Sequence, residues 1–506
     1  MKIVGFHSGH DSAYSILEDG VPIVHNELER FNRRKNSVAD SMQFFLDNEK
    51  NFKDIKYMTT HRTGGMSNNG YMDSFNKCQK IVEDNGGGLY IIGHHQSHAA
   101  NSFFTSDMDE ALIVTIDGGG LDYTDGSLHS KASIDKFPFD NKTFRTCTTV
   151  WYGKDNKIQP IDFIEGGYLN LGFYWALCTK KIFGLGTWRD PRGDQAGTVM
   201  GMAALGNPDK YLNHFVNVSD STYNKLSGEA KYQPIDIEFL IEEANKSEQN
   251  KFDIAASLQK KTEECIHELL TPLVKKYKVK NLCLSGGVSL NCVAVGKMLD
   301  WFPGINIFCD PIPYDAGLSL GSSRYLYHHI LDNPRVYNNP QNKSSYLGYT
   351  YDKKDIDTVL ESHEDSIKVQ RVDDDFVVDK MIDKHIISVF GGGSESGRRA
   401  LGNRSIVADP RHAETKDIVN EKVKHRQWFR PFAPSVMREH VTEWFEHDVD
   451  SPYMSVCLKF KKDMKDKVPA VLHFDGTARL QTVSEENNKW YYNFIKKFRD
   501  KTGVPI

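Results

Sequence analysis

Two histidines, His94 and His98, stand four residues apart in the run Gly-His-His-Gln-Ser-His-Ala. Residues i and i+4 share one face of a helix, so the two imidazoles can converge on one metal ion, whereas His95 faces elsewhere. Two carboxylates follow apolar runs, Asp117 in Asp-Gly-Gly-Gly and Asp315 in a later loop. Imidazoles and carboxylates together suit a divalent transition metal. We therefore predict that these four residues hold a metal ion and leave one or two positions open for substrate or water.

Loops after predicted strands are candidates for binding phosphate. The run Ser-Gly-Gly-Val-Ser-Leu-Asn, with Gly286, Gly287 and Asn291, joins a strand to a helix and offers a helix N-terminus to an anion. A tight turn without a ligand is an equally good interpretation. Behind the first strand, Gly-His-Asp-Ser-Ala carries His10, whose imidazole could act as a general base near neutral pH. The alternative for that run is a polar turn capped by Asp11.

Cations cluster in two further stretches. Residues 27–35 carry four cations and two carboxylates, which favours a solvated helix face, or anion binding by Lys35 or an arginine. Residues 391–434 combine several glycines with the arginines Arg398, Arg399, Arg404, Arg411, Arg426 and Arg430. Guanidinium forks fit phosphate and carboxylate groups, so this stretch predicts a pocket for a triphosphate or an acyl phosphate. A network of structural salt bridges is the alternative. The run from His473 to Val483 favours an ordinary Asp-Gly turn.

Short apolar runs that alternate with longer amphipathic ones must position these groups. The predicted strands are Lys2–Phe6, Pro22–Asn26, Leu89–Ile92, Ala111–Ile116, Asn281–Leu284, Ile305–Cys309 and Ile386–Phe390. The strand over Ala111–Ile116 is expected to end there and to present Asp117 at its mouth. The strongest helix pattern covers Ala255–Tyr277, where Pro272 is expected to kink or shorten the helix. Strands alternating with helices predict an α/β fold.

The composition is that of a globular protein of two or three domains. The chain has 506 residues, of which 39% are apolar and 26% charged, with a net charge of -5. This charge gives no electrostatic basis for binding nucleic acid or a membrane, and no apolar run is long enough to span a bilayer. The eight scattered cysteines predict buried thiols in a reducing cytoplasm. A stretch rich in proline and asparagine, Asp332–Ser345, predicts an exposed domain boundary.

Taken together, the motifs resemble the O-carbamoyltransferases of the NodU/CmcH family. The histidine pair belongs to the resemblance, and the other matching segments, in order, are His10–Ala13, Gly286–Asn291, Arg399–Ser405, Arg430–Pro434 and Asp475–Arg479. The resemblance implies an actin-like ATPase (ASKHA) domain over residues 1–335 and a YrdC-like α/β domain over residues 346–506. Relatives of this type usually continue beyond the position of Ile506, so the second domain is expected to be incomplete at its C-terminus.

The resemblance also implies an activity. The YrdC-like domain would make carbamoyl adenylate from carbamoyl phosphate and ATP with Mg²⁺, and the large domain would pass the carbamoyl group to a hydroxyl of a small molecule. The four predicted ligands would hold Fe²⁺. His10 would act as the base with Lys35 nearby, while the nucleotide and phosphate contacts would fall to Gly286, Gly287, Asn291, Arg399, Arg404, Ser405 and Arg430. A cytoplasmic enzyme is expected, and a homodimer is compatible with the sequence.

Two other functions fit the same residues. A kinase or nucleotide hydrolase of the actin-like fold would produce ADP rather than AMP. A non-catalytic nucleotide-binding protein that depends on a partner chain would bind nucleotide without turnover.

Overall fold

The structure is a computed structural model, and it describes residues 1–61, 69–123, 129–131, 143–164, 170–186, 195–215, 222–223, 230–231 and 236–506. The chain divides into two compact units, Met1–Lys343 and Ser344–Ile506. The division falls close to the stretch rich in proline and asparagine. Much of the segment between residues 125 and 142 lies outside the described residues.

The first sheet of the N-terminal unit has the strand order β3-β2-β1-β4-β5-β7. Its strands are β1 (Lys2–His7), β2 (Ala13–Glu18), β3 (Val21–Glu27), β4 (Ile55–His61), β5 (Gly88–Ile92) and β7 (His129–Lys131). Strands β1, β2 and β3 form an antiparallel meander, and β1, β4 and β5 run parallel. The parallel strands are rich in apolar residues because both faces of this sheet are covered.

The second sheet repeats this arrangement in the order β13-β12-β6-β8-β9. Its strands are β6 (Glu110–Tyr123), β8 (Thr143–Lys154), β9 (Lys157–Ile164), β12 (Asn281–Ser285) and β13 (Asn306–Cys309). Strands β6, β8 and β9 form the antiparallel meander, and β6, β12 and β13 run parallel. Strand for strand, the order and directions match those of β1 to β5, so the unit consists of two halves with the same topology.

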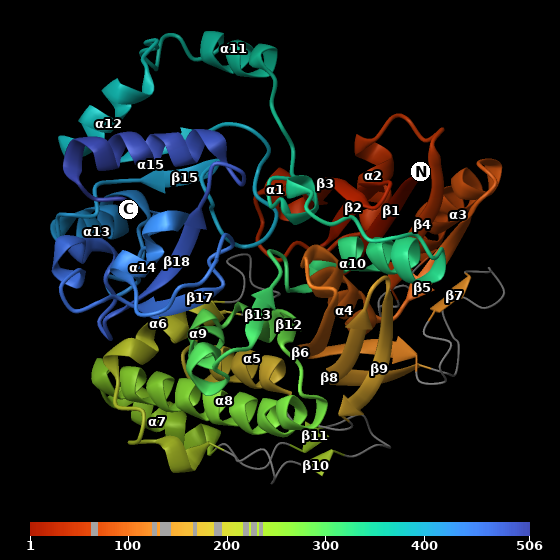
Figure 1. The fold of residues 1–506 in the computed structure, drawn as a ribbon, viewed down its shortest axis with the longest axis horizontal. Coiled ribbons are helices and arrows are strands. Elements are labelled where there is room, and N and C mark those ends of the chain that lie inside the picture. Colours follow the sequence, from red (N-terminus) through yellow and green to blue (C-terminus); the bar gives the residue numbers. More distant parts are fainter. Residues whose placement is uncertain are drawn as a thin grey trace. The chain divides into compact units, whose positions relative to one another are not determined.

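Two helices lie between the sheets, and each packs on the sheet that it does not follow. Helix α4 (His94–Thr105) leaves the first sheet after β5 but packs on β6 and β12, whereas α10 (Leu318–Arg324) leaves the second sheet and packs on β1 and β2 (Figure 1). The two helices also pack on each other, and a Cβ atom at Gly321 would lie 1.9 Å from the Ser97 carbonyl oxygen. Glycine is therefore required for the close approach of α10 to α4.

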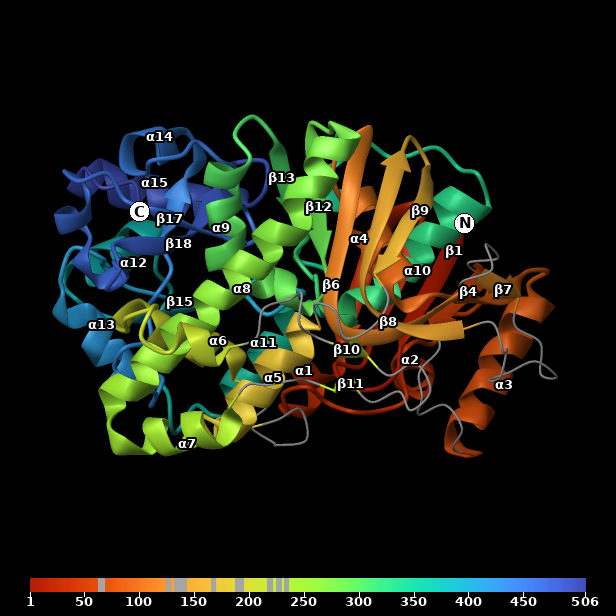
Figure 2. The ribbon, with the colours of Figure 1, turned by 90° about the horizontal axis from the view of Figure 1, so that it is seen from below.

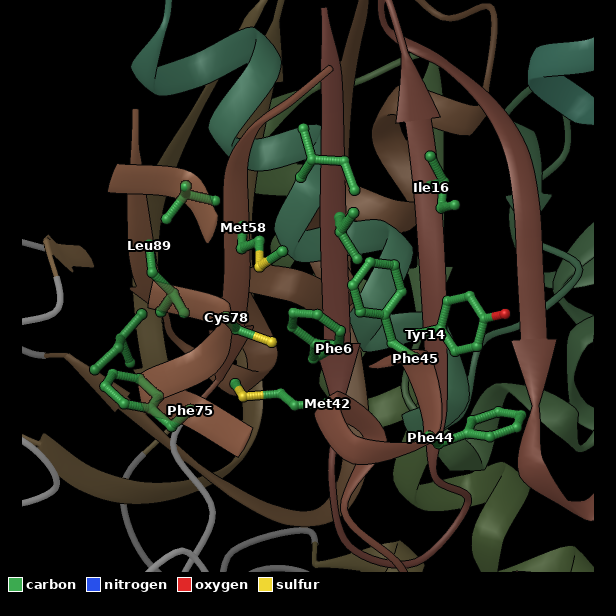
Figure 3. Packing of buried hydrophobic residues seen from close by; sticks show 14 residues of the cluster. Phe6, Tyr14, Ile16, Met42, Phe44, Phe45, Met58, Phe75, Cys78 and Leu89 are labelled. Atoms are coloured by element: carbon green, nitrogen blue, oxygen red, sulfur yellow. The ribbon is translucent and has the colours of Figure 1, made fainter. Parts of the chain in front are cut away.

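The outer face of the first sheet carries an apolar core. Helices α2 (Ser41–Asn48) and α3 (Asn69–Asp84) cover this face, and Phe6, Tyr14 and Phe45 pack edge to face within it (Figure 3). Such aromatic pairs add about 0.5–1.5 kcal/mol beyond the area that they bury. This core fixes β1 and so the start of the loop that carries His10.

Helix α1 (Leu28–Asn32) follows β3 and packs on it. The other helices of the unit lie around the second sheet (Figure 2), and they are α5 (Leu171–Lys181), α6 (Ala196–Met202), α7 (Ile237–Lys246), α8 (Glu248–Tyr277) and α9 (Cys292–Trp301). Strand β10 (Thr222–Tyr223) pairs with β11 (Ala230–Lys231). Helix α8 begins at Glu248, where the Ser247 side chain accepts the Asn250 N–H, and it continues through Pro272. The expectation that Pro272 shortens this helix is wrong, because the helix ends where the apolar stripe ends.

The C-terminal unit has two small sheets, the pair β14 (Ile387–Phe390) and β15 (Arg404–Val407), and the order β16-β18-β17. The second sheet consists of β16 (Ser435–Met437), β17 (Val456–Lys459) and β18 (Thr477–Val483). The helices are α11 (Lys353–Glu361), α12 (Asp374–Ile382), α13 (Glu414–Ile418), α14 (Val441–Trp444) and α15 (Lys489–Thr502). Helix α15 packs on α12 and β16, with Phe494 and Phe498 fully buried.

Most predicted elements are confirmed. Each predicted strand coincides with a strand of the structure, although two of them begin one residue later than predicted, at Asn306 and Ile387. The helix predicted over Ala255–Tyr277 lies within α8, and the α/β class is correct. All eight cysteines are free thiols, buried except for the half-buried Cys457. Among the residues that the structure describes, no helix is both long and apolar enough to cross a bilayer.

Candidate functional site

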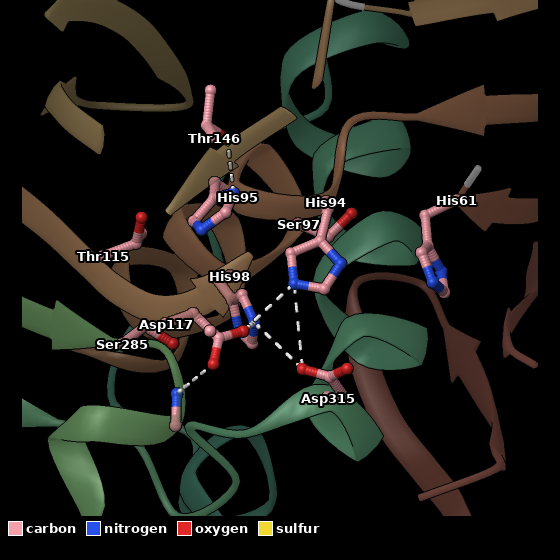
Figure 4. A network of polar contacts seen from close by, with 12 residues as sticks. His61, His94, His95, Ser97, His98, Thr115, Asp117, Thr146, Ser285 and Asp315 are labelled. Carbon is pink, nitrogen blue, oxygen red and sulfur yellow. Dashed lines mark hydrogen bonds and ion pairs between the residues drawn. The ribbon is translucent and has the colours of Figure 1, made fainter. Parts of the chain in front are cut away.

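The structure brings His94, His98, Asp117 and Asp315 together in the N-terminal unit (Figure 4). One possible ligand atom from each residue lies within 4.8 Å of the others. The Asp117 Oδ2 atom is 3.1 Å from His94 Nε2 and 3.3 Å from His98 Nε2. The Asp315 Oδ1 atom is 3.7 Å and 3.6 Å from the same two nitrogens.

These separations suit a single small cation. Metal–ligand bonds of about 2.1 Å place neighbouring donor atoms about 3.0 Å apart in an octahedron and about 3.4 Å apart in a tetrahedron. The nitrogen–oxygen distances of 3.1–3.7 Å bracket the tetrahedral value. The donor set of two imidazoles and two carboxylates also suits a divalent transition metal, so the residues present fit the predicted ion.

Without a cation, protons balance the charge of this cluster. Burial lowers the pKa of His98, but the hydrogen bonds and charges of Asp117 and Asp315 outweigh burial and raise it to about 9. Burial and Asp315 raise the pKa of Asp117, but the hydrogen bonds from His94 and His98 hold it well below its usual range. The cluster is therefore strongly coupled, and a bound cation would take the place of imidazolium protons.

Helix α4 supplies both imidazoles. Its residues are all buried, which is unusual for a segment with three histidines, and some of its polar atoms, such as His98 Nδ1, have no hydrogen-bond partner among the described residues. His95, which the helical spacing turns away from the pair, donates its Nδ1 proton to Asp122 Oδ2 at 2.8 Å. The prediction that His95 lies outside the ligand set is consistent with this contact.

The Asp-Gly-Gly-Gly run does not end a strand, which corrects the expectation that Asp117 lies at a strand's mouth. Strand β6 continues to Tyr123, and its pairing with β8 shifts between Ile116 and Gly120. The segment Asp117–Gly119 bulges out of the ladder, and Gly119 has a φ of +131°. Bulges re-aim side chains, and glycine tolerates this backbone without strain. The bulge thus turns Asp117 toward α4.

Substitution of Gly120 by alanine is expected to displace His94. A Cβ atom there would lie 2.0 Å from the imidazole Cγ of His94, so the ring must move. We expect Gly120→Ala to lower the free energy of unfolding by roughly 1–3 kcal/mol, as overpacking does, and to weaken metal binding. Thermal melting and metal titration measure both effects. Gly118→Ala is the matched control, since its Cβ would meet no described atom closer than 3.7 Å; equal effects of both variants would contradict the prediction.

Asp315 is held in place from the first sheet. It begins a short 3₁₀ turn (Asp315–Gly317) that leads into α10. The Tyr314 hydroxyl donates to Glu27 Oε2 at 2.7 Å, and His25 Nε2 lies 2.9 Å from the Ala316 carbonyl. Glu27 is thus a buried residue at the end of β3, whereas the charged residues 27–35 favoured a solvated helix face.

His10 touches the same cluster. Its Nδ1 lies 3.0 Å from Asp11 Oδ2, and its Nε2 lies 3.3 Å from Asp315 Oδ2. Burial lowers the pKa of His10, but the charge of Asp315 and the contacts with Asp11 raise it to about 9. The predicted base therefore lies beside a predicted metal ligand, while Lys35 lies exposed in the turn after α1.

A second histidine pair supports the loop of His10. His7 Nε2 lies 2.7 Å from the His10 carbonyl, and because a carbonyl only accepts, His7 carries its proton on Nε2. His7 Nδ1 must then accept the Nε2 proton of His61, 2.9 Å away. Burial lowers the pKa of His7 to about 4, which keeps it neutral. His61 ends strand β4, and no sequence pattern points to it, because a single histidine at a strand end has no distinguishing neighbours.

The loop behind β12 adjoins the metal cluster. Gly286 has a φ of +87°, and the Gly287 N–H donates to Asp117 Oδ1 at 3.2 Å. Asn291 caps α9 by accepting the Ala294 N–H, and its amide also bonds with Gln259. Gly287 thus orients a predicted ligand, whereas the role of these three residues toward a nucleotide remains a prediction.

In the C-terminal unit, the loop with Arg399, Arg404 and Ser405 is organised by a buried acid. Glu395 Oε1 accepts three backbone N–H groups, from Leu401, Asn403 and Arg404. The Arg404 guanidinium donates to the carbonyls of residues 391 and 392 and stacks on Phe390, and the Ser405 hydroxyl accepts the N–H of residue 402. Arg399 is half-buried in this loop.

Arg430 lies in a group of like charges. Burial, together with the charges of Arg430 and Arg479, lowers the pKa of Arg426 to about 10. Burial and the charge of Arg479 also lower the pKa of Arg430. The Arg479 Nε atom is buried and has no hydrogen-bond partner among the described residues. Mutually repelling guanidinium groups are stabilised by an anion, so this group suits phosphate. By contrast, Arg411 forms a salt bridge with Asp409, as the alternative of structural salt bridges predicted for this stretch.

The run from His473 to Val483 contains the predicted Asp-Gly turn. Gly476 has a φ of +81°, and Asp475 Oδ1 accepts the Thr477 N–H at 3.0 Å. The turn opens strand β18, which carries Arg479 toward Arg426.

Comparisons with known proteins agree on one family. The family model described as "Carbamoyltransferase N-terminus" matches residues 28–323, and "Carbamoyltransferase C-terminus" matches residues 378–506. Nodulation protein NolO of Bradyrhizobium diazoefficiens is 32% identical over 82% of this chain and 71% of its own length. Nodulation protein NolNO of Sinorhizobium fredii is 30% identical over 98% of this chain and 73% of its own length.

A solved structure shows a weaker likeness. The crystal structure of full-length HypF in the phosphate- and nucleotide-bound form aligns with a TM-score of 0.39 and 12% identity. The alignment covers 65% of this chain and 46% of that one. This score is too low to establish a common fold.

Proposed function

We propose, because this chain belongs to the carbamoyltransferase family, that it is an ATP-dependent O-carbamoyltransferase that acts on a hydroxyl of a small molecule. Membership of this family makes the protein a transferase enzyme. The observation that carries the finer proposal is the convergence of His10 with the four predicted metal ligands, since this cluster joins a base to a cation site.

The proposed reaction has two steps. Carbamoyl phosphate, water and ATP give carbamoyl adenylate, phosphate and pyrophosphate; the acceptor alcohol and carbamoyl adenylate then give the O-carbamoyl product and AMP. The adenylate is needed because a carbamoyl carbon is a poor electrophile without a good leaving group. The arginines Arg426, Arg430 and Arg479 are suited to the phosphates of the first step, since they are half-buried and their charges repel one another.

In the transfer step, His10 takes the proton of the acceptor hydroxyl. The alcohol oxygen bonds to the carbamoyl carbon, and the bond from that carbon to the adenylate oxygen breaks. Such base catalysis contributes roughly 10²–10⁴-fold. Asp11 orients the ring by accepting from Nδ1, which leaves Nε2 to receive the proton. A divalent cation held by the four ligands, Fe²⁺ in our proposal, would supply positive charge for the carbonyl and phosphoryl oxygens.

The pKa of His10 fits this role once a cation is present. A pKa of about 9 would keep the imidazole protonated at neutral pH, and the charge of Asp315 is a main cause of that value. A cation on Asp315 offsets the negative charge and disfavours the imidazolium. A cation bound there would thus favour the neutral form of His10, which can accept a proton.

Metal binding is accordingly expected to release protons. At pH 7 the metal-free protein carries a proton on the ligand nitrogen of His98, whose pKa is about 9, and this proton must leave. Affinity should rise about tenfold per pH unit for each proton released, up to about pH 9. Calorimetric titration with Zn²⁺ in buffers of different ionisation enthalpy counts the protons. An affinity independent of pH between 6 and 8 would contradict the coupling.

The topology of the N-terminal unit supports the proposal of an actin-like fold. Two sheets with the same strand order, and two helices that each pack on the other half's sheet, are what a duplicated actin-like fold would have. The ends of β1, β5, β12 and β13 face this site, which is where α/β sheets bind ligands. We extend the proposal to a YrdC-like C-terminal unit, supported by the cationic group around Arg430.

Product analysis tests the proposed function. Protein supplied with metal, ATP and carbamoyl phosphate should form AMP and pyrophosphate only when both substrates are present. Carbamoyl transfer is then followed by mass spectrometry with a panel of sugars and other polyols. Formation of ADP would favour a kinase, and nucleotide binding without any turnover would favour the partner-dependent protein. Either outcome would overturn the adenylation step.

A further inference from the structure

We propose that Asp122 is a positioning residue for the metal centre, because its carboxylate replaces the missing N-cap of the helix that presents His94 and His98. This inference rests on the proposed metal site. Asp122 lies in β6, five positions beyond Asp117, and it is 1% exposed.

Helix α4 has no cap of its own. The residue before its first turn is Gly93, which has no side chain to accept the first N–H groups. Asp122 Oδ1 accepts the backbone N–H of His95 at 2.8 Å and that of Gln96 at 3.3 Å. These are the second and third residues of the helix, whose N–H groups a capping side chain normally satisfies. A Cβ atom at Gly93 would lie 2.7 Å from Asp122 Oδ1, so the glycine makes room for this carboxylate.

The second oxygen of Asp122 fixes the helix against rotation. Asp122 Oδ2 accepts the Nδ1 proton of His95 at 2.8 Å and the hydroxyl proton of Thr146, on β8, at 2.5 Å. His95 Nε2 is buried without a hydrogen-bond partner among the described residues. The His95 ring is thus anchored on one side only, by Asp122 and Thr146. Because His95 belongs to the same helix as His94 and His98, anchoring its ring fixes the rotation of the helix and so the direction of both predicted ligands.

Charge favours the same arrangement. A carboxylate stabilises the N-terminal end of a helix and a cation the C-terminal end. At the other end of α4, Arg335 donates to the carbonyls of Phe103 and Ser106, and Arg324 donates to that of Asn101. The helix is held at both ends by charges of the appropriate sign. Strand β6 therefore sets the distance from Asp117 to the imidazoles, since it carries both the ligand and the anchor.

The test compares metal binding with folding. Cobalt(II) is titrated into the full chain, and its visible absorption reports the number and geometry of the ligands. Asp122→Asn keeps the shape and one acceptor but loses the charge, and we expect cobalt affinity to fall 10–100-fold with an altered spectrum. Thr146→Val, a milder change that keeps the strand, should weaken binding in the same direction but less.

Asp253→Asn is the matched control. Asp253 is likewise a buried carboxylate that accepts a backbone N–H, from Asn207 at 2.9 Å, but it lies in α8. Its variant should lower the melting temperature without changing cobalt affinity or spectrum. If the Asp253 variant loses affinity as strongly, or if the Asp122 and Thr146 variants bind cobalt as the unaltered chain does, the positioning role is wrong. If the unaltered chain itself binds no cobalt, the proposed metal site fails instead.

Discussion

Replacement of Asp315 by asparagine is expected to stop carbamoyl transfer while pyrophosphate formation continues. Asp315 Oδ1 faces both ligand imidazoles, and Oδ2 lies 3.3 Å from His10 Nε2. The variant loses a ligand charge of the cation site and the charged neighbour of the base, with little change of shape. Pyrophosphate formation depends on the C-terminal unit in our proposal, so it should be unaffected.

The expected loss is large. If Asp315 contributes about 4 kcal/mol to stabilising the transition state through the cation and the base, transfer falls about 10³-fold. Chromatography of the carbamoylated acceptor measures transfer, and a coupled assay measures pyrophosphate in the same sample. Asp253→Asn, a buried carboxylate in α8, serves as the control. Equal loss of both activities would show that the two steps do not reside in separate sites.

Arg430→Ala should have the opposite pattern, with pyrophosphate formation falling about 10²–10³-fold. Loss of a positioned donor to a developing oxyanion has an effect of this size. Because burial and Arg479 already depress the pKa of Arg430, its charge is unfavourable in the protein without an anion. The variant should therefore melt no lower than the unaltered chain, and its cobalt spectrum should be unchanged.

The matched control for this arginine is Arg438→Ala. Arg438 lies in the same unit, where Nη1 pairs with Asp448 Oδ1 at 2.7 Å. Pyrophosphate formation should survive its loss, since surface pairs of this kind contribute little. A clear drop in the melting temperature of Arg430→Ala, with unchanged pyrophosphate formation, would make Arg430 a structural residue.

The sequence predicted well what depends on local periodicity. The helical spacing of His94 and His98 and the apolar runs before Asp117 and Asp315 were enough to identify residues that the structure brings together. Each of these signals is a short pattern that the local backbone follows directly. The seven predicted strands and α8 were found for the same reason, whereas strands such as β2 and β4 were not predicted.

What the sequence missed depends on contacts between distant segments. The bulge at Asp117 requires β8 as its partner, so a strand pattern alone could not show that β6 continues to Tyr123. Asp122 and Glu27 acquire their roles only when another element reaches them. The glycine before His94, where a capping residue is usual, was the one local sign that the cap must come from elsewhere.

Because α4 and α10 pack crosswise, the proposed cation site joins the two halves of the N-terminal unit. His94, His98 and Asp117 move with the second sheet, whereas Asp315 is tied to the first through Tyr314 and Ala316. Any hinge motion that separates the two halves must therefore move Asp315 away from the other three predicted ligands. An ion that binds all four residues thus favours the closed arrangement of the two halves. By thermodynamic linkage, any ligand that closes the halves raises the affinity for the ion by the same factor.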